Sequence, residues 1–156
     1  MLKEKLAVRL SADLATSAER AYRIFVSEPT SWWPTAHSVN SSPIKAVIIE
    51  PKAGGRWYEE GEDGSEKDWG KVIALEPSTC VTLAWQLDGA YAFDPNFRTE
   101  VEAWFTPTGP NSCRVEFEHR GLEAYGTAAE QMQEMLASPG GWPLEAEGLA
   151  KACMAG

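Results

Sequence analysis

The sequence predicts an α+β fold in which a run of antiparallel strands lies between an N-terminal helix and a helical C-terminal segment. Segments with the two-residue period of half-buried strands dominate the middle of the chain, and segments with helical spacing flank them. No repeat, low-complexity tract or linker divides the 156 residues. We therefore expect a single domain over residues 1–156 with one continuous core.

The N-terminal third is expected to form a strand, a helix and a second strand. Residues 2–10 alternate between charged and apolar side chains, which is typical of a half-buried strand. The spacing then becomes helical, and Thr16 with Glu19 three residues later predicts a capping box at the helix start. Two prolines end this helix, a polar loop follows, and residues 44–51 form a brief β-branched strand.

The middle of the chain is expected to form a hairpin followed by three strands. The turn signal Asp63-Gly64 lies between residues 54–60 and 66–77, which predicts the hairpin. Strands are expected at residues 78–87, 97–107 and 112–120. In the last two, apolar and charged residues alternate cleanly, which indicates an antiparallel sheet with one covered face and one face in water.

The C-terminal part is expected to be helical in two pieces. Residues 127–136 place Ala128, Met132 and Met135 on one side, and the sequence SPGG then breaks the helix. Residues 142–154 resume it, with an apolar stripe formed by Trp142, Ala146, Leu149 and Cys153. This stripe is suited to cover the apolar face of the sheet.

Charge and composition exclude several classes of function. A formal net charge of −9 argues against nucleic acid and against anionic membranes. The sequence has no apolar block that would span a membrane or form a signal peptide, so a cytoplasmic location is expected. Cys80, Cys113 and Cys153 are widely spaced and form no CxxC pair, as expected for thiols in a reducing compartment.

Sequence motifs for nucleotide, metal and nucleophile chemistry are absent. The chain has no GxxxxGK[ST], GxGxxG, GxSxG or HExxH motif, so no catalytic residue and no cofactor is predicted. Its two histidines are His37 and His119. Cys113 shares a strand face with His119 but lies about 20 Å away along an extended strand, too far for joint ligation. No metal site is expected.

Three charged features are interpreted as surface features. The acids between Glu59 and Asp68 lack the ligand pattern of a calcium loop and are expected to form a water-exposed hairpin tip. Arg56 is expected to form a cross-strand salt bridge with these acids, or alternatively to anchor a ligand carboxylate. His37 lies in a polar loop and is expected to be exposed.

The order of several motifs resembles a known family. These motifs are Trp32-Trp33, Gly54-Gly55-Arg56-Trp57, Asp63-Gly64 before Trp69-Gly70, Trp85, and EHRGL ending in Gly121-Leu122. Nearly the whole chain is similar to bacterial proteins related to the activator of heat-shock protein 90 ATPase, within the START-like (SRPBCC) superfamily. This resemblance implies a helix-grip fold, with a curled antiparallel sheet of about six or seven strands around a C-terminal helix, short N-terminal helices, and a cavity between sheet and helix.

The resemblance and the strand faces together give candidate ligand-binding residues, each of which could also be ordinary core. Sequence cannot separate the two because pockets are themselves mostly apolar. His119 is the polar exception, and it is interpreted as a hydrogen-bonded histidine at a strand end, a ligand anchor or a general base. The candidates are Trp33, Trp57, Trp85, Val101, Ala103, Phe105, Phe117, His119, Trp142 and Leu149. Whether Trp57 or Tyr58 faces the cavity is left open.

Two departures from the family bear on function. Glu145, Glu147 and Gly148 replace a bulkier apolar stretch, which could enlarge the cavity or leave an apolar surface for a second subunit. Gly148 inside a helix costs about 1 kcal/mol relative to alanine. The eukaryotic activator also carries a separate N-terminal domain that engages the chaperone, and no such domain is expected within these 156 residues.

We therefore expect a protein that binds a small apolar or amphipathic molecule, such as a lipid, an aromatic compound or a polyketide-like metabolite. The first alternative is a cyclase-like or hydrolase-like enzyme using the same cavity. The second is a chaperone-interacting module.

Overall fold

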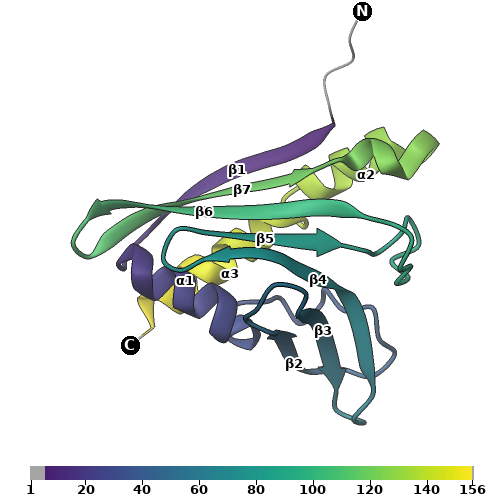
Figure 1. Cartoon of the computed structure of the whole chain (residues 1–156), viewed down its shortest axis with the longest axis horizontal. Helices are drawn as coiled ribbons and strands as arrows, with labels where there is room; N and C mark the ends of the chain where they lie inside the picture. The colour runs from purple at the N-terminus through teal and green to yellow at the C-terminus, as the bar shows by residue number, and fades with distance from the viewer. Residues whose placement is uncertain (1–5, 156) are drawn as a thin grey trace, which may run out of the picture.

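A computed structural model describes residues 6–155. One seven-stranded antiparallel sheet has the order β1-β7-β6-β5-β4-β3-β2. Strand β4 runs beside β5 and then bends, and β2 and β3 follow the bent part away from the direction of β5 to β7 (Figure 1). The elements in chain order are β1 (Ala7–Leu14), α1 (Ala18–Ser27), η1 (Pro29–Ser31), β2 (Ile44–Ile49), β3 (Arg56–Gly61), β4 (Glu66–Glu76), β5 (Cys80–Trp85), β6 (Thr99–Gly109), β7 (Ser112–Arg120), η2 (Leu122–Ala128), α2 (Ala129–Ala137) and α3 (Trp142–Met154). The predicted α+β helix-grip architecture is confirmed.

The sheet has one apolar and one polar face, as the alternation in β6 and β7 predicts. On the inner face Val101, Ala103 and Phe117 are buried, and the helices α1 and α3 pack against this side. On the outer face Arg120 forms ion pairs with three glutamates of β6 and β7. This charged network keeps the outer face in water.

Helix α1 begins one residue later than its capping pattern predicts. Ser17 is the N-cap, and its hydroxyl accepts a hydrogen bond from the Arg20 amide at 3.2 Å. The capping box expected at Thr16 is therefore wrong, because the Thr16 hydroxyl instead accepts from the Arg20 guanidinium. Arg20 also donates to the Cys153 carbonyl at 2.7 Å and so ties α1 to the end of α3. The N-terminal residues 2–5 of the expected first strand lie outside the described residues.

The β3–β4 hairpin forms at the predicted turn. Gly64 has a φ of 83°, a backbone conformation that favours glycine, and Arg56 forms ion pairs with Glu66 and Asp68 at 3.1 and 2.7 Å. The cross-strand interpretation of Arg56 is therefore confirmed. The expectation that all the acids lie at a wet tip is wrong for Glu59, because its side chain points into the core and is fully buried.

The helices of the C-terminal part cover the sheet through a stripe that differs slightly from the predicted one. In α2 the buried residues are Ala129, Met132 and Leu136, whereas Met135 is 43% exposed. In α3 the predicted stripe is buried and also includes Glu145. Gly148 faces the backbone of Trp32, where a Cβ would lie 2.2 Å from the Trp32 carbonyl oxygen. The glycine therefore allows α3 to approach the segment after η1 closely.

Candidate functional site

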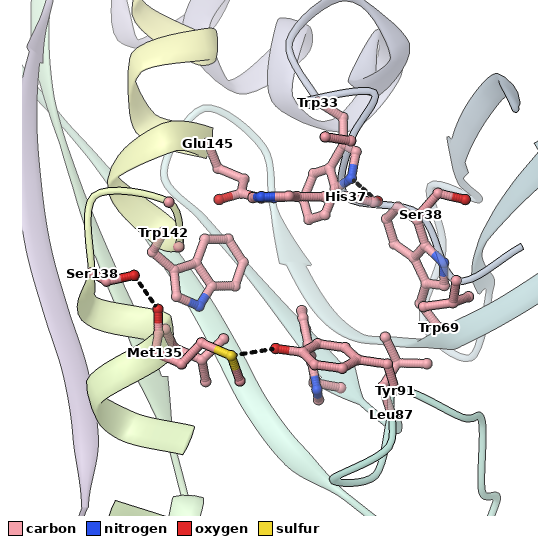
Figure 2. Close-up of a pocket in the computed structure, with 16 residues that line it drawn as sticks. Trp33, His37, Ser38, Trp69, Leu87, Tyr91, Met135, Ser138, Trp142 and Glu145 are labelled. Carbon is pink, nitrogen blue, oxygen red and sulfur yellow. Dashed lines mark hydrogen bonds and ion pairs between the residues drawn. The ribbon is translucent and has the colours of Figure 1, made fainter. Parts of the chain in front are cut away.

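A pocket of about 470 Å³ opens between α3, the end of α2, the loop after η1 and strands β4 and β5 (Figure 2). This volume is in the range of small-molecule sites. Its lining residues are Trp33, Ala36, His37, Ser38, Val39, Trp69, Trp85, Leu87, Tyr91, Met135, Leu136, Ser138, Gly140, Gly141, Trp142 and Glu145. The pocket is mostly apolar, with a small number of polar groups.

Four tryptophans from four different segments form the walls of this pocket. Trp33 follows η1, Trp69 lies in β4, Trp85 ends β5 and Trp142 begins α3. The ring centroids of Trp33 and Trp69 are 4.8 Å apart, and those of Trp85 and Trp142 are 6.0 Å apart. Such contacts are in the range of favourable aromatic pairs.

Hydrogen bonds fix the orientation of all four indoles. The indole N–H groups of Trp33, Trp69, Trp85 and Trp142 donate to the His37 carbonyl, the Glu59 carboxylate, the Tyr125 hydroxyl and His119 Nδ1 at 2.9, 3.0, 2.9 and 3.0 Å. With their polar atoms satisfied by protein groups, these rings present apolar surface to the pocket. A ligand that meets them gains contact area without ordering flexible side chains.

The polar end of the pocket is a paired histidine and glutamate. His37 Nδ1 is hydrogen-bonded to the Glu145 carboxylate, although these residues come from the loop after η1 and from α3. The Glu145 side chain is 5% exposed and that of His37 28%. Burial raises the pKa of the Glu145 carboxyl, and the hydrogen bond and charge of His37 offset part of this rise. The expectation that His37 is an exposed loop residue is therefore wrong.

Buried Glu59 holds the loop that carries His37. Its carboxylate accepts hydrogen bonds from the Ser38 hydroxyl and the Val39 amide, both at 2.6 Å, and from the Trp69 indole. Three donors around one carboxylate compensate for its removal from water. Glu59 thus positions one wall of the pocket from behind.

The mouth of the pocket is bordered by Tyr91 and Met135. Figure 2 shows the two side chains meeting, and the Tyr91 hydroxyl lies 3.9 Å from the Met135 sulfur. Tyr91 belongs to the loop between β5 and β6 and has a φ of 59°. The pocket is therefore narrowed by two side chains from separate segments.

The ten ligand-binding candidates divide between the pocket and the core behind it. Trp33, Trp85 and Trp142 line the pocket. Trp57 faces inward and is buried, with its ring 5.5 Å from Trp69, while Tyr58 packs under the Arg56 guanidinium. The others, which are buried without lining the pocket, are Val101, Ala103, Phe105, Phe117, His119 and Leu149.

His119 is a fully hydrogen-bonded member of this core. It is 1% exposed, its Nδ1 accepts from Trp142, and its Nε2 lies 2.8 Å from the Thr99 hydroxyl. Since Nδ1 accepts, Nε2 carries the proton and donates to Thr99. Burial lowers the pKa of His119 to about 3. These contacts favour the interpretation of His119 as a structural histidine that orients Trp142.

We expect His119 to make the stability of the fold pH-dependent. The unfolded chain binds a proton at His119 near pH 6.5, whereas the folded chain does so only near pH 3. Stability is therefore fully present above pH 6.5 and is lost as the pH falls, by at most about 1.4 kcal/mol per pH unit. Urea unfolding of wild type and His119→Gln between pH 7 and about 5, where ordinary carboxylates stay ionised, should show a steeper loss in wild type. Parallel curves would contradict this assignment.

Among residues 6–155, no group of three or more His, Cys, Asp or Glu side chains could hold a metal ion. No helix in this range is both long and apolar enough to cross a membrane.

The chain matches one family model and is similar in fold to several solved structures. A family model described as "Activator of Hsp90 ATPase homolog 1-like protein" matches residues 15–153. The anthrahydroquino-gamma-pyrone synthase Txn09, solved in a complex, is 32% identical, with a TM-score of 0.66 over 97% of this chain and 99% of its own. No curated protein matches the sequence.

Two further solved structures share the fold at lower identity. CalC from Micromonospora echinospora, described as a self-sacrificing resistance protein, is 23% identical, with a TM-score of 0.70 over 96% of this chain and 94% of its own. The Aha1 dimer from Colwellia psychrerythraea is 14% identical, with a TM-score of 0.61 over 94% and 95% of the two chains. At these identities the likeness supports the fold alone.

Proposed function

We propose that this chain, which belongs to the Activator of Hsp90 ATPase homolog 1-like family as its motifs predicted, binds a flat aromatic small molecule in the tryptophan-lined pocket. The observation that carries this proposal is the set of four indoles around one cavity of about 470 Å³. Aromatic rings bury large areas against one another and gain further from offset or edge-to-face contacts.

The shape and chemistry of the walls favour an aromatic ligand over a lipid chain. Trp33, Trp69, Trp85 and Trp142 present rigid, nearly flat surfaces, whereas a flexible acyl chain would lose more conformational freedom on binding. Txn09, at 32% identity, is named for an anthrahydroquino-gamma-pyrone, which is a fused aromatic ring system. The His37–Glu145 pair offers a polar group on such a ligand one place to bind.

A bulky side chain in the pocket is expected to weaken ligand binding without unfolding the protein. Ala36 is exposed and lines the pocket, so Ala36→Phe should weaken the binding of 2-methoxyanthraquinone at least tenfold, or by about 1.4 kcal/mol. Ala124 is also exposed but lies outside the pocket, so Ala124→Phe serves as the matched control. Equilibrium dialysis measures both variants, with palmitate as the lipid comparison. Equal affinities in both variants, or tighter binding of palmitate, would contradict the proposal.

A second candidate function is an enzyme that converts this same ligand. The observation in its favour is the His37–Glu145 pair inside the pocket, since a histidine held by a carboxylate is a common acid–base unit. That the 32% identical Txn09 is named a synthase supports a cyclase-like reaction over a hydrolase-like one. Incubation of the protein with hydroxylated aromatic ketones, followed by mass spectrometry of the products, tests this candidate.

We further propose that residues 1–156 act as one domain in the cytoplasm. All three cysteines are free and buried, which suits a reducing compartment. The sequence also suggested a homodimer and a chaperone partner, and the comparisons give these two less support. The neighbour described as an Aha1 dimer is only 14% identical.

A further inference from the structure

We propose that His37 and Glu145 form a proton-accepting pair that selects ligands with an acidic hydroxyl, such as phenols and enols, over the corresponding ethers. This inference rests on the proposed aromatic ligand and specifies its chemistry. It is carried by the position of the pair at the pocket wall, by the burial of Glu145 and by the hydrogen bonds that hold His37.

The hydrogen bond to Glu145 determines which nitrogen of His37 can react. When Nδ1 donates to the Glu145 carboxylate, the neutral imidazole carries its lone pair on Nε2. Among residues 6–155 no hydrogen bond to Nε2 is formed, and the His37 side chain remains 28% exposed at the pocket. Nε2 is therefore open to a ligand.

The backbone around His37 is fixed on both sides, so the ring is held in place before a ligand arrives. The His37 amide donates to the Pro34 carbonyl at 3.0 Å, and its carbonyl accepts from the Trp33 indole at 2.9 Å. The next two residues are held by Glu59. A base that is already oriented loses less entropy when it engages the ligand.

The proton transfer is balanced within the site. The O–H bond of the ligand breaks, an N–H bond forms at His37 Nε2, and the ligand keeps the electron pair as a phenolate or enolate. The resulting imidazolium lies between this anion and the Glu145 carboxylate, which stabilises it as the carboxylate of a catalytic triad does. No oxidant, reductant or metal is required.

Few other titratable groups face the pair. Tyr91, from the loop between β5 and β6, is the other ionisable side chain that lines the pocket. Burial raises its pKa, and so does the negative charge of Glu145, so Tyr91 remains a neutral phenol. The remaining lining residues, from the segment after η1, β4, β5 and the loop after it, α2, the α2–α3 connection and α3, carry no charge. Protonation of the pair is therefore set mainly by His37, Glu145 and the ligand.

The test uses a ligand whose proton can be followed by absorbance. The phenolate of 2-hydroxyanthraquinone absorbs at longer wavelength than the phenol, so a pH titration gives the apparent pKa of the bound compound. We expect wild-type protein to lower this pKa by about one unit or more, because an imidazolium beside an oxygen favours its anion. The ether 2-methoxyanthraquinone has no such proton and reports occupancy of the pocket alone.

Three variants test whether the pKa shift of the bound ligand comes from His37 and Glu145. His37→Asn keeps an amide donor close to the place of Nδ1 but accepts no proton, so the pKa shift of bound 2-hydroxyanthraquinone should disappear, and titration with the ether measures how much of this variant's pocket is occupied. Glu145→Gln should reduce the shift, whereas Glu147→Gln, an exposed residue two positions along α3, should leave it unchanged. A shift retained in His37→Asn, or absent in wild type while the ether binds, would overturn this inference. If neither compound binds, the proposed aromatic ligand is wrong, and the inference fails with it.

Discussion

Glu59→Ala is expected to lower the free energy of unfolding by about 3–5 kcal/mol. The substitution leaves the Ser38 hydroxyl, the Val39 amide and the Trp69 indole without their shared acceptor, and the Trp69 indole is buried away from water. Because these donors hold one wall of the pocket, binding of 2-methoxyanthraquinone should be lost at temperatures where the variant remains folded. Urea unfolding monitored by circular dichroism measures the stability, and dialysis at low temperature measures the binding.

The neighbouring residue Glu60 provides the matched control for this prediction. It lies on the other face of β3, 32% exposed, with Lys45 at 3.9 Å as its ion-pair partner. Glu60→Ala should change stability by less than about 1 kcal/mol, as is usual for surface ion pairs. Similar losses in the two variants would mean that the hydrogen bonds of Glu59 do not stabilise the loop.

Gly148→Ala is expected to destabilise the fold by about 2–3 kcal/mol, although alanine is the better helix former. The intrinsic gain in helix propensity is about 1 kcal/mol. It is outweighed because the new Cβ would lie 2.2 Å from the Trp32 carbonyl oxygen, a backbone atom that cannot rotate away. Helix α3 must then move from Trp32, which loosens the contact between α3 and the segment that carries Trp33.

Gly140 provides the matched control, because space is available there for an added side chain. An added Cβ at Gly140 meets no atom within 4 Å. Gly140→Ala should therefore leave stability unchanged within about 0.5 kcal/mol. Thermal unfolding of both variants tests the pair, and a Gly148→Ala protein as stable as Gly140→Ala would show that α3 does not need this close approach.

The sheet and its two faces were predictable from the sequence because strand periodicity is a local property. The alternation in β6 and β7 places Val101 and Phe117 inside and Arg120 outside, as the structure has them. The two glycines before β3 are required by the backbone there. Gly54 has a φ of 81°, and a Cβ on Gly55 would lie 2.5 Å from the Glu50 carbonyl oxygen.

The polar part of the site was not predicted because it is made by contacts between distant segments. His37 and Glu145 lie in a polar loop and a helix, 108 residues apart, and neither local pattern requires the other. A partial signal was present for Glu145, which lies three residues after Trp142 and so on the buried stripe of α3. Glu59 carried a similar signal, since it lies two residues after Trp57 and therefore on the same face of β3.

Which inward-facing residues line the pocket and which belong to the core could not be predicted from the sequence either. Trp33, Trp85 and Trp142 line the cavity, whereas Trp57 is buried behind it. All four are large aromatic residues on inward faces, so composition and periodicity treat them alike. Their positions relative to the cavity depend on how the sheet curls and on where α2 ends.

The most direct test of the proposed function follows the indole N–H signals of the seven tryptophans by two-dimensional NMR during titration with 2-methoxyanthraquinone. We expect saturable shifts with one dissociation constant for Trp33, Trp69, Trp85 and Trp142, which line the pocket. Trp104 lies in β6, is 41% exposed and is outside this pocket, so its signal should not move. The absence of saturable shifts among the four, or a largest shift at Trp104, would contradict the binding of an aromatic ligand in this pocket.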